Sequence, residues 1–247
     1  IDTAGNFQLR KRSGSEAMIS AAVDGAVTLY YNNVNVVATD ANGILLTGVP
    51  ATGNQIKLNT SDTADSGVLQ ISGGGAAGNT RGGYINLAGN EHAGAGYVQI
   101  IAGNTGSEYI GFYTGASVER MRIDASGNGG IGVTPQIWHT SYRAMSVGGT
   151  GSVFGTTTAG AAGQIGVVQN GFVNTGGSWL YTFSDEASLY EAVNGIHTFY
   201  IAASGTAGNP ISFLPALQIN NSQQVRNPVD NAGFYTGAGD DMHLYWD

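Results

Sequence analysis

Three carboxylates close together in the sequence are the first residues whose type and spacing suggest chemistry. Asp185, Glu186 and Glu191 could supply the acid and base of a polysaccharide-cleaving site. Such a pair must lie roughly 5 to 9.5 Å apart across the sugar bond. A solvated loop or a helix start explains the same residues, because nothing in the sequence fixes the carboxylate geometry. We therefore expect no catalytic residue.

Histidines beside other polar residues are the second set. Glu91-His92, Trp138-His139 and the pair Asp241 and His243 could ligate a divalent ion, since alternate residues of a strand share a face. Each pair lacks a second ligand at a fixed spacing, so we expect no metal, although a threefold axis would bring three copies of one histidine together. No cofactor is expected either.

Aromatic residues become denser after Pro135 and are the strongest binding candidates. An aromatic ring with a polar group at its edge can stack on a sugar and hydrogen-bond to it at a partly solvent-exposed surface. The candidate glycan-contacting residues are Trp138, Trp179, Tyr181 and Tyr190, with Trp246 near the end of the chain. For most of them, packing in a core is the stronger explanation.

Composition excludes several classes of protein. The chain has 247 residues, no cysteine, 40 glycines, and 17 acidic against 9 basic side chains, which gives a net charge of −8. Disulfides and thiolate chemistry are therefore impossible. So few scattered basic residues predict no nucleic-acid partner. No apolar run approaches the ~20 residues of a membrane span, so we expect no membrane insertion.

Short strands dominate the predicted secondary structure. Between residues 54 and 123, pairs of apolar residues separated by one position recur every 11 to 16 residues. The pairs are Ile56/Leu58, Leu69/Ile71, Ile85/Leu87, Val98/Ile100, Ile110/Phe112 and Met121/Ile123. A strand places alternate residues on one face, so each pair predicts a short strand followed by a glycine-rich turn.

Three further segments carry local predictions. Asn32-Asn33, between two apolar runs, predicts a hairpin turn. Ser184 to Val193 fits a short helix with Ser184 as its cap, or a surface loop. His197, Phe199 and Ile201 alternate with Ile196, Thr198 and Tyr200, which predicts a strand buried on both sides.

Internal repeats are visible in the sequence. The run G-F-Y-T-G-A occurs at residues 111–116 and again 122 residues later, at 233–238. The run I-D-T-A-G-N at residues 1–6 returns as I-D-A-S-G-N at 123–128, with the same offset. Repeated strand-and-turn units are typical of modular proteins in which each unit packs on its neighbours.

These repeated runs resemble the cassettes of bacteriophage tail fibres and related tail structural proteins. Residues 120–135 (R-M-R-I-D-A-S-G-N-G-G-I-G-V-T-P) resemble the fibre cassette R-M-R-I-D-S-S-G-N-V-G-I-G-T-T-x-P, with Gly129-Gly130 in place of Val-Gly. Two other fibre cassettes are similar to segments of this chain: residues 24–32 (D-G-A-V-T-L-Y-Y-N) and residues 239–247 (G-D-D-M-H-L-Y-W-D). The resemblance is scattered from one end of the chain to the other and transfers no catalytic residue.

The resemblance implies an all-β fold, an elongated homotrimeric fibre of short glycine-rich strands, with a β-prism- or β-helix-like shaft and a more globular β-sandwich-like segment. The expected modules are 1–53, an N-terminal strand and hairpin module; 54–135, the strand ladder; 136–228, the aromatic-rich module; and 229–247, the start of another cassette. Intertwined copies would pair strand edges and bury apolar faces.

The expected function is a structural and adhesive one, in a virion and outside the host cell. The partners would be two further copies, other tail proteins, and a bacterial surface polysaccharide or protein receptor. A tailspike-like polysaccharide depolymerase and a purely structural shaft without a ligand site are the alternatives.

Overall fold

A computed structural model of the chain describes residues 6–11, 16–32, 34–41, 43–46, 56–58, 63–75, 78, 80–160, 163–229, 234–236 and 242–244. Within these ranges the chain forms strands, turns and loops and no helix, which confirms the all-β prediction. None of the described segments is a helix long and apolar enough to cross a membrane. The chain divides into two compact units, residues 1–69 with 88–96, and residues 70–87 with 97–247.

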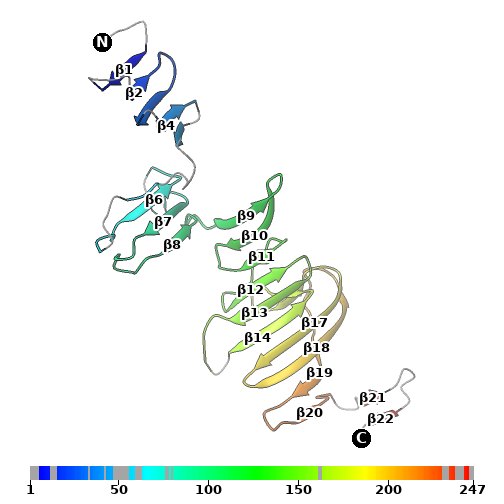
Figure 1. Ribbon diagram of the computed structural model, residues 1–247. Helices are drawn as coiled ribbons and strands as arrows, with labels where there is room; N and C mark the ends of the chain where they lie inside the picture. The colour runs from blue at the N-terminus through cyan, green and yellow to red at the C-terminus, as the bar shows by residue number, and fades with distance from the viewer. Residues whose placement is uncertain are drawn as a thin grey trace. The chain divides into compact units, whose positions relative to one another are not determined.

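The first unit contains a five-stranded antiparallel sheet in chain order (Figure 1). Its strands are β1 (Phe7–Arg10), β2 (Ala17–Ala21), β3 (Val27–Tyr31), β4 (Val34–Asp40) and β5 (Gly43–Leu46). β3 and β4 are joined at positions 32–33, as the hairpin prediction requires. Asn32 has a φ of 48°, a left-handed conformation that asparagine tolerates better than most residues.

A three-stranded sheet follows, in the order β6-β7-β8. Its strands are β6 (Val68–Ser72), β7 (Tyr84–Ala88) and β8 (Val98–Ile101). β7 and β8 run antiparallel, with Ile85 opposite Ile100 and Leu87 opposite Val98. These strands confirm three of the predicted apolar pairs, whereas the pair Ile56/Leu58 lies in a segment without regular structure.

The main element of the second unit is a curved ten-stranded sheet, ordered β20-β19-β18-β17-β14-β13-β12-β11-β10-β9 (Figure 1). Its strands are β9 (Tyr109–Thr114), β10 (Val118–Asp124), β11 (Gly129–Ile131), β12 (Tyr142–Val147), β13 (Gly151–Thr156), β14 (Gln164–Gln169), β17 (Asp185–Val193), β18 (Ile196–Gly205), β19 (Leu214–Ile219) and β20 (Val225–Arg226). β11 and β12 pair in parallel, so the sheet continues across the predicted module boundary at residue 135.

Two hairpins complete the described strands. β15 (Gly171–Val173) pairs with β16 (Trp179–Tyr181), and β21 (Phe234–Thr236) pairs with β22 (Met242–Leu244). β9 and β21 contain the two copies of F-Y-T, and each is the first strand of an antiparallel hairpin. Both copies of the repeat therefore contribute to the first strand of a β-hairpin.

Within the segment from Ser184 to Val193, Asp185–Val193 form a strand, so both the helix and the loop predictions were wrong. β17 lies between β14 and β18 and pairs with both along most of its length. Ala187 and Leu189 are buried while Ser188 between them is exposed, the period of two of a strand. Pairing on both sides decided the conformation of a segment whose local pattern was ambiguous.

One face of the ten-stranded sheet is covered by an aromatic core. Phe154, Val168 and Leu189 point from the sheet toward Trp138, which precedes β12, and toward the β15–β16 hairpin. The rings of Trp138 and Phe154 stack with centroids 5.3 Å apart. The second layer consists of the β15–β16 hairpin, the segment with Trp138 between β11 and β12, and the segment with Phe213 between β18 and β19. This layer is smaller than the sheet it covers.

Glycine at position 166 is required by this packing. A Cβ there would lie 2.5 Å from the Phe154 ring and 2.8 Å from the carbonyl oxygen of Tyr190. Gly166 stands opposite Phe154 in the sheet, so the ring crosses the neighbouring strand at the one residue without a side chain. Glycine within the strands thus serves the packing of large aromatics.

The run I-D-A-S-G-N forms the turn between β10 and β11. Asp124 Oδ1 accepts hydrogen bonds from the backbone N–H of Ser126 at 2.9 Å and of Asn128 at 2.8 Å. Gly127 has a φ of 81°. Asn128 is only 1% exposed, and its Oδ1 accepts the backbone N–H of Ala144 at 3.1 Å. The turn therefore ties β11 to β12, while residues 1–5 of the other copy lie outside the described residues.

Replacing Asn128 by alanine is expected to lower the free energy of unfolding by about 1–3 kcal/mol, because the buried N–H of Ala144 loses its acceptor. Chemical denaturation followed by tryptophan fluorescence measures the loss. The matched control is Asn104→Ala at an exposed position, which should change stability little. Equal effects of the two substitutions would contradict the role assigned to Asn128.

Candidate functional site

The most extensive feature of the second unit is the other face of the ten-stranded sheet, which is apolar and exposed. The register places one apolar residue after another in line across the strands: Met121, Ile131, Val147, Val153, Val167, Tyr190, Phe199 and Leu217 are among them. Ile165 is 58% exposed and Phe199 44%. We call this surface the open face.

The open face carries almost no charge. From Met121 in β10 to Ile219 in β19, its paired positions include one arginine, Arg143, and no carboxylate. The chain as a whole has a net charge of −8. The acidic groups are thus kept off the open face, as expected of a surface that is covered by another apolar surface.

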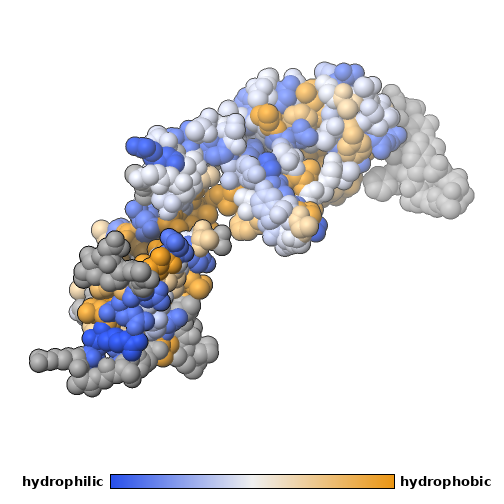
Figure 2. Space-filling view, turned by 90° about the horizontal axis from the view of Figure 1, so that it is seen from above, coloured by the Kyte–Doolittle hydropathy of each residue, from blue (hydrophilic) through white to orange (hydrophobic). Residues whose placement is uncertain are grey.

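The two smaller sheets share this one-sided character. In the first unit, Phe7, Val27 and Leu29 point to the same face of the five-stranded sheet as Ile19, and all three of these larger side chains are exposed. In the three-stranded sheet, Leu87 and Val98 face each other, and Val98 is 69% exposed. Figure 2 shows apolar side chains in orange at the surface among polar ones.

The prediction that residues 196–201 are buried on both sides was wrong for one side. Thr198 and Ala202 of β18 are buried under the core, whereas Phe199 and Ile201 lie on the open face and are exposed. Alternate residues do lie on opposite faces of the strand, as predicted. However, a single chain supplies a second layer on one side of the sheet only.

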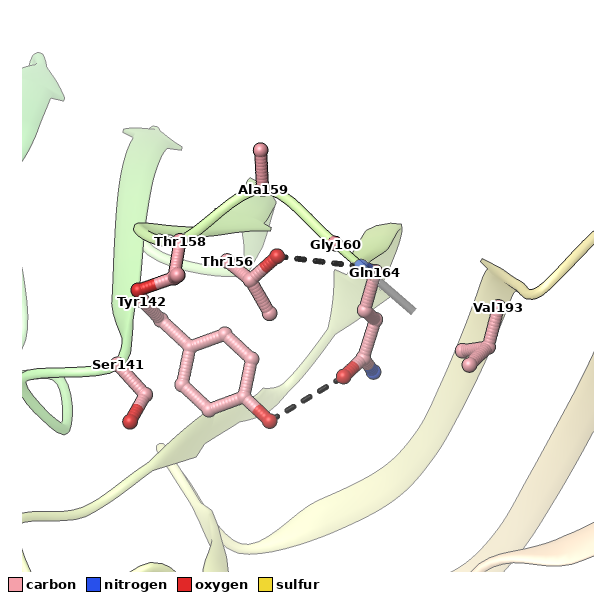
Figure 3. A pocket seen from close by; sticks show the side chains of 8 residues that line it. All are labelled: Ser141, Tyr142, Thr156, Thr158, Ala159, Gly160, Gln164 and Val193. Atoms are coloured by element: carbon pink, nitrogen blue, oxygen red, sulfur yellow. Dashed lines mark hydrogen bonds between the residues drawn. The ribbon is translucent and has the colours of Figure 1, made fainter. Parts of the chain in front are cut away.

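A polar pocket lies at one end of the sheet, on the side of the aromatic core (Figure 3). It has a volume of about 640 Å³ and is open to solvent. The lining residues come from β12, β13, β14, β17 and the loop after β13: Ser141, Tyr142, Thr156, Thr158, Ala159, Gly160, Gln164 and Val193. We call this cavity the Tyr142 pocket.

A chain of hydrogen bonds organises the wall of the Tyr142 pocket. The Tyr142 hydroxyl donates to Gln164 Oε1 at 3.2 Å, and Gln164 Nε2 donates to Glu191 Oε2 at 2.6 Å. The other oxygen of Glu191 accepts from the Tyr200 hydroxyl at 2.8 Å. Both oxygens of this carboxylate are therefore engaged, and the amide orientation of Gln164 is fixed.

Tyr142 and Tyr200, the two tyrosines of this hydrogen-bond network, remain protonated over a wide pH range. Burial, and then the negative charge of Glu191, raises the pKa of the Tyr142 phenol. Burial, and then the hydrogen bond to Glu191, raises the pKa of Tyr200. The pocket consequently presents neutral hydroxyl and amide groups.

Three of the four aromatic residues predicted to contact a glycan lie in the core. Trp138 is 3% exposed, Tyr181 is buried, and Trp179 packs against Phe154 with ring centroids 5.4 Å apart. Burial leaves Trp138 and Tyr181 no free ring face, so these assignments are corrected. Tyr190 lies on the open face, where its hydroxyl is 2.7 Å from Nδ1 of His197. Trp246 lies outside the described residues.

The three candidate carboxylates do not form one site within a chain. Asp185 and Glu186 are exposed at the start of β17, and Glu191 lies further along the same strand. At ~3.3 Å per residue, Glu186 and Glu191 are separated by roughly 16 Å, beyond the ~9.5 Å limit for a glycosidic acid–base pair. The backbone N–H of Glu186 donates to Asp185 Oδ1 at 3.0 Å.

The candidate metal ligands among the described residues serve as turn acceptors. His92 Nδ1 accepts the N–H of Gly94 at 3.2 Å, and His139 Nδ1 accepts the N–H of Ser141 at 3.2 Å. Among the residues that the structure describes, no group of three or more histidines and carboxylates could hold a metal ion. Asp241 and the side chain of His243 lie outside the described part.

A polar cluster on the β9–β10 hairpin was not identified from the sequence. Arg122 binds the Glu119 carboxylate through two hydrogen bonds of 2.6 Å and lies 4.0 Å from the centre of the Tyr109 ring. The Tyr113 hydroxyl donates to Glu119 Oε2 at 2.9 Å. Gly111 lies beneath the two tyrosine rings, where a Cβ would be 2.9 Å from Tyr109. The charges neutralise each other, so the cluster stabilises the hairpin.

Comparison with known proteins gives no match. No protein-family model, no curated protein and no solved structure matches this chain. The open face, the Tyr142 pocket and the cassettes are therefore the features that indicate a function.

Replacing Arg122 by glutamine should raise the pKa of Glu119, because the guanidinium holds that pKa below its ordinary value. A lowered pKa stabilises the folded hairpin above the unfolded-state pKa of ~4.3, and the contribution is lost as the pH falls through the folded-state pKa. An NMR titration of the Glu119 side chain measures the shift. An unchanged midpoint in the variant would contradict the ion pair.

Proposed function

We propose that this chain is a structural and adhesive component of a bacteriophage tail fibre, with three copies associated along their sheets. In this proposal the fibre acts in the virion, joined to other tail proteins, and attaches to a bacterial surface polysaccharide or protein. The cassettes at residues 24–32, 120–135 and 239–247 support the class of protein.

The observation that carries the proposal is the open face. Its side chains alternate with those of the aromatic core, so the ten-stranded sheet is apolar on both sides but covered on one. Burying the remaining exposed half of an isoleucine or phenylalanine would contribute roughly 1–1.5 kcal/mol per side chain, half of the value for complete burial. Copies of the same face bring no like charges together, apart from Arg143, which supports self-association.

A polysaccharide depolymerase is the alternative. Glu191 is the one candidate carboxylate beside a cavity, since it binds Gln164 of the Tyr142 pocket. A second carboxylate would have to come from another copy, because Asp185 and Glu186 are too distant along β17. A shaft without a ligand site is the third possibility.

The variant Val167→Glu should weaken association without unfolding the chain. It places a charge between Val153 and Tyr190 in the middle of the open face, where burial without a partner is unfavourable. Light scattering should give a mass near three times that of one chain for the native protein and a lower mass for the variant. Circular dichroism should remain that of a β protein.

The matched control is Thr175→Glu, which adds the same charge at an exposed position of the β15–β16 turn. It should leave the mass unchanged. A native protein that is monomeric at every concentration, or equal masses for both variants and the native chain, would overturn the association of copies through this face.

Incubation with purified bacterial surface polysaccharides separates the adhesive function from the alternatives. The adhesive proposal expects retention of the chain on the polymer and no release of reducing sugar. Release of reducing sugar that is abolished by Glu191→Gln would instead establish the depolymerase. Absence of both retention and release, on polysaccharides and on intact cells, would favour the shaft without a ligand site.

A further inference from the structure

The Tyr142 pocket differs from the open face in its chemistry and lies on the opposite side of the sheet. Tyr142, Thr156, Gln164 and Val193 occupy the register positions that face the aromatic core, in the pairs Tyr142 with Thr156 and Gln164 with Val193. Their neighbours Gly155 and Ile165 face the other way. Copies that associate through the open face would leave the Tyr142 pocket accessible.

Its groups are neutral, which restricts the class of ligand. None of the eight lining residues is charged. A phosphate or a carboxylate would therefore meet no cation in the lining. The Glu191 carboxylate behind Gln164 adds a negative charge that further disfavours an anion. The lining itself has no carboxylate that could ligate a metal ion or bind an ammonium group, so a ligand meets neutral hydroxyl and amide groups.

The hydrogen-bonding groups suit a polyhydroxylated molecule. The hydroxyls of Ser141 and Thr158 line an open cavity and belong to exposed residues. Gln164 keeps one amide hydrogen and one lone pair after its bonds to Glu191 and Tyr142. The Tyr142 hydroxyl donates to Gln164 and can still accept from a ligand. Each group can thus form a hydrogen bond with a sugar hydroxyl.

The size and rigidity of the cavity agree with this assignment. A volume of about 640 Å³ lies within the range of ligand sites. The ring of Tyr142 packs edge to face against Phe154 at 5.8 Å and Trp138 at 6.4 Å between centroids, so the core fixes its position. Figure 3 shows this ring between Ser141 and Gln164, so its apolar ring atoms lie beside polar groups.

We infer that the Tyr142 pocket binds an uncharged sugar unit, held by the Tyr142 hydroxyl, the Gln164 amide and the loop hydroxyls of Ser141 and Thr158. The identification of that sugar as part of a bacterial surface glycan rests on the proposed function; the binding chemistry does not.

Saturation-transfer NMR and titration with the methyl glycosides of glucose, galactose and mannose and with N-acetylglucosamine test the inference, with glucuronic acid as the charged probe. At least one neutral sugar should bind, and glucuronic acid should bind more weakly. Tyr142→Phe and Thr158→Val should each weaken binding up to about tenfold, the effect of one hydrogen bond. Ala159→Trp, at an exposed loop position, should fill the cavity and abolish binding.

The matched control is Tyr181→Phe, which removes a hydroxyl bonded to the Ala203 carbonyl, away from the pocket. It should bind as the native chain does. The inference is overturned if no neutral sugar binds at millimolar concentration, if glucuronic acid binds more tightly than glucose, or if binding survives all three pocket variants.

Light scattering on the same samples keeps this result separate from the proposed function. A protein that associates but binds no sugar would overturn the pocket inference alone. A monomer that binds sugar through Tyr142 would overturn the association and support the pocket.

Discussion

The constraint on which the structure depends is that its ten-stranded sheet has two apolar faces and a single chain covers one of them. In the ten-stranded sheet the covered face carries Phe154, Val168 and Leu189, and the uncovered face carries Val153, Val167 and Tyr190 at the alternate positions. Hydrophobic burial is the dominant favourable term in folding. In the proposed assembly, other copies would cover the open face, and the absence of carboxylates from that face agrees with this proposal.

The covered face shows how a glycine-rich chain builds a core. A large aromatic side chain fills the space above a residue that has no side chain, as Phe154 does above Gly166. Trp138 then packs on Phe154 and Trp179 from the second layer. The high glycine content and the cluster of aromatics after residue 135 are two parts of one packing arrangement.

The Tyr142 pocket begins where this core ends. Tyr142 has its ring in the aromatic cluster and its hydroxyl on Gln164, so the same side chain belongs to the core and to the pocket wall. Behind it, the two carboxylate oxygens of Glu191 accept hydrogen bonds from Gln164 and Tyr200. A rigid neutral surface with unused hydrogen-bonding capacity results, on the side of the sheet away from the open face.

The sequence by itself determined the strands whose signal is local. Five of the six predicted apolar pairs lie in strands, and Asn32 lies in the predicted hairpin turn, because alternation and turn chemistry act between neighbouring residues. The resemblance to tail-fibre cassettes matched segments that form turns and hairpins. The all-β fold followed from the same local patterns.

Only the tertiary structure decided which residues are buried and which form a site. Residues 185–193 became a strand through pairing with β14 and β18, and Trp138 became a core residue because the parallel pairing of β11 with β12 brings its segment across the sheet. The Tyr142 pocket joins residues from 141 to 193. Such contacts depend on strand order and register, which are set by pairing between residues distant in the sequence and leave no local pattern.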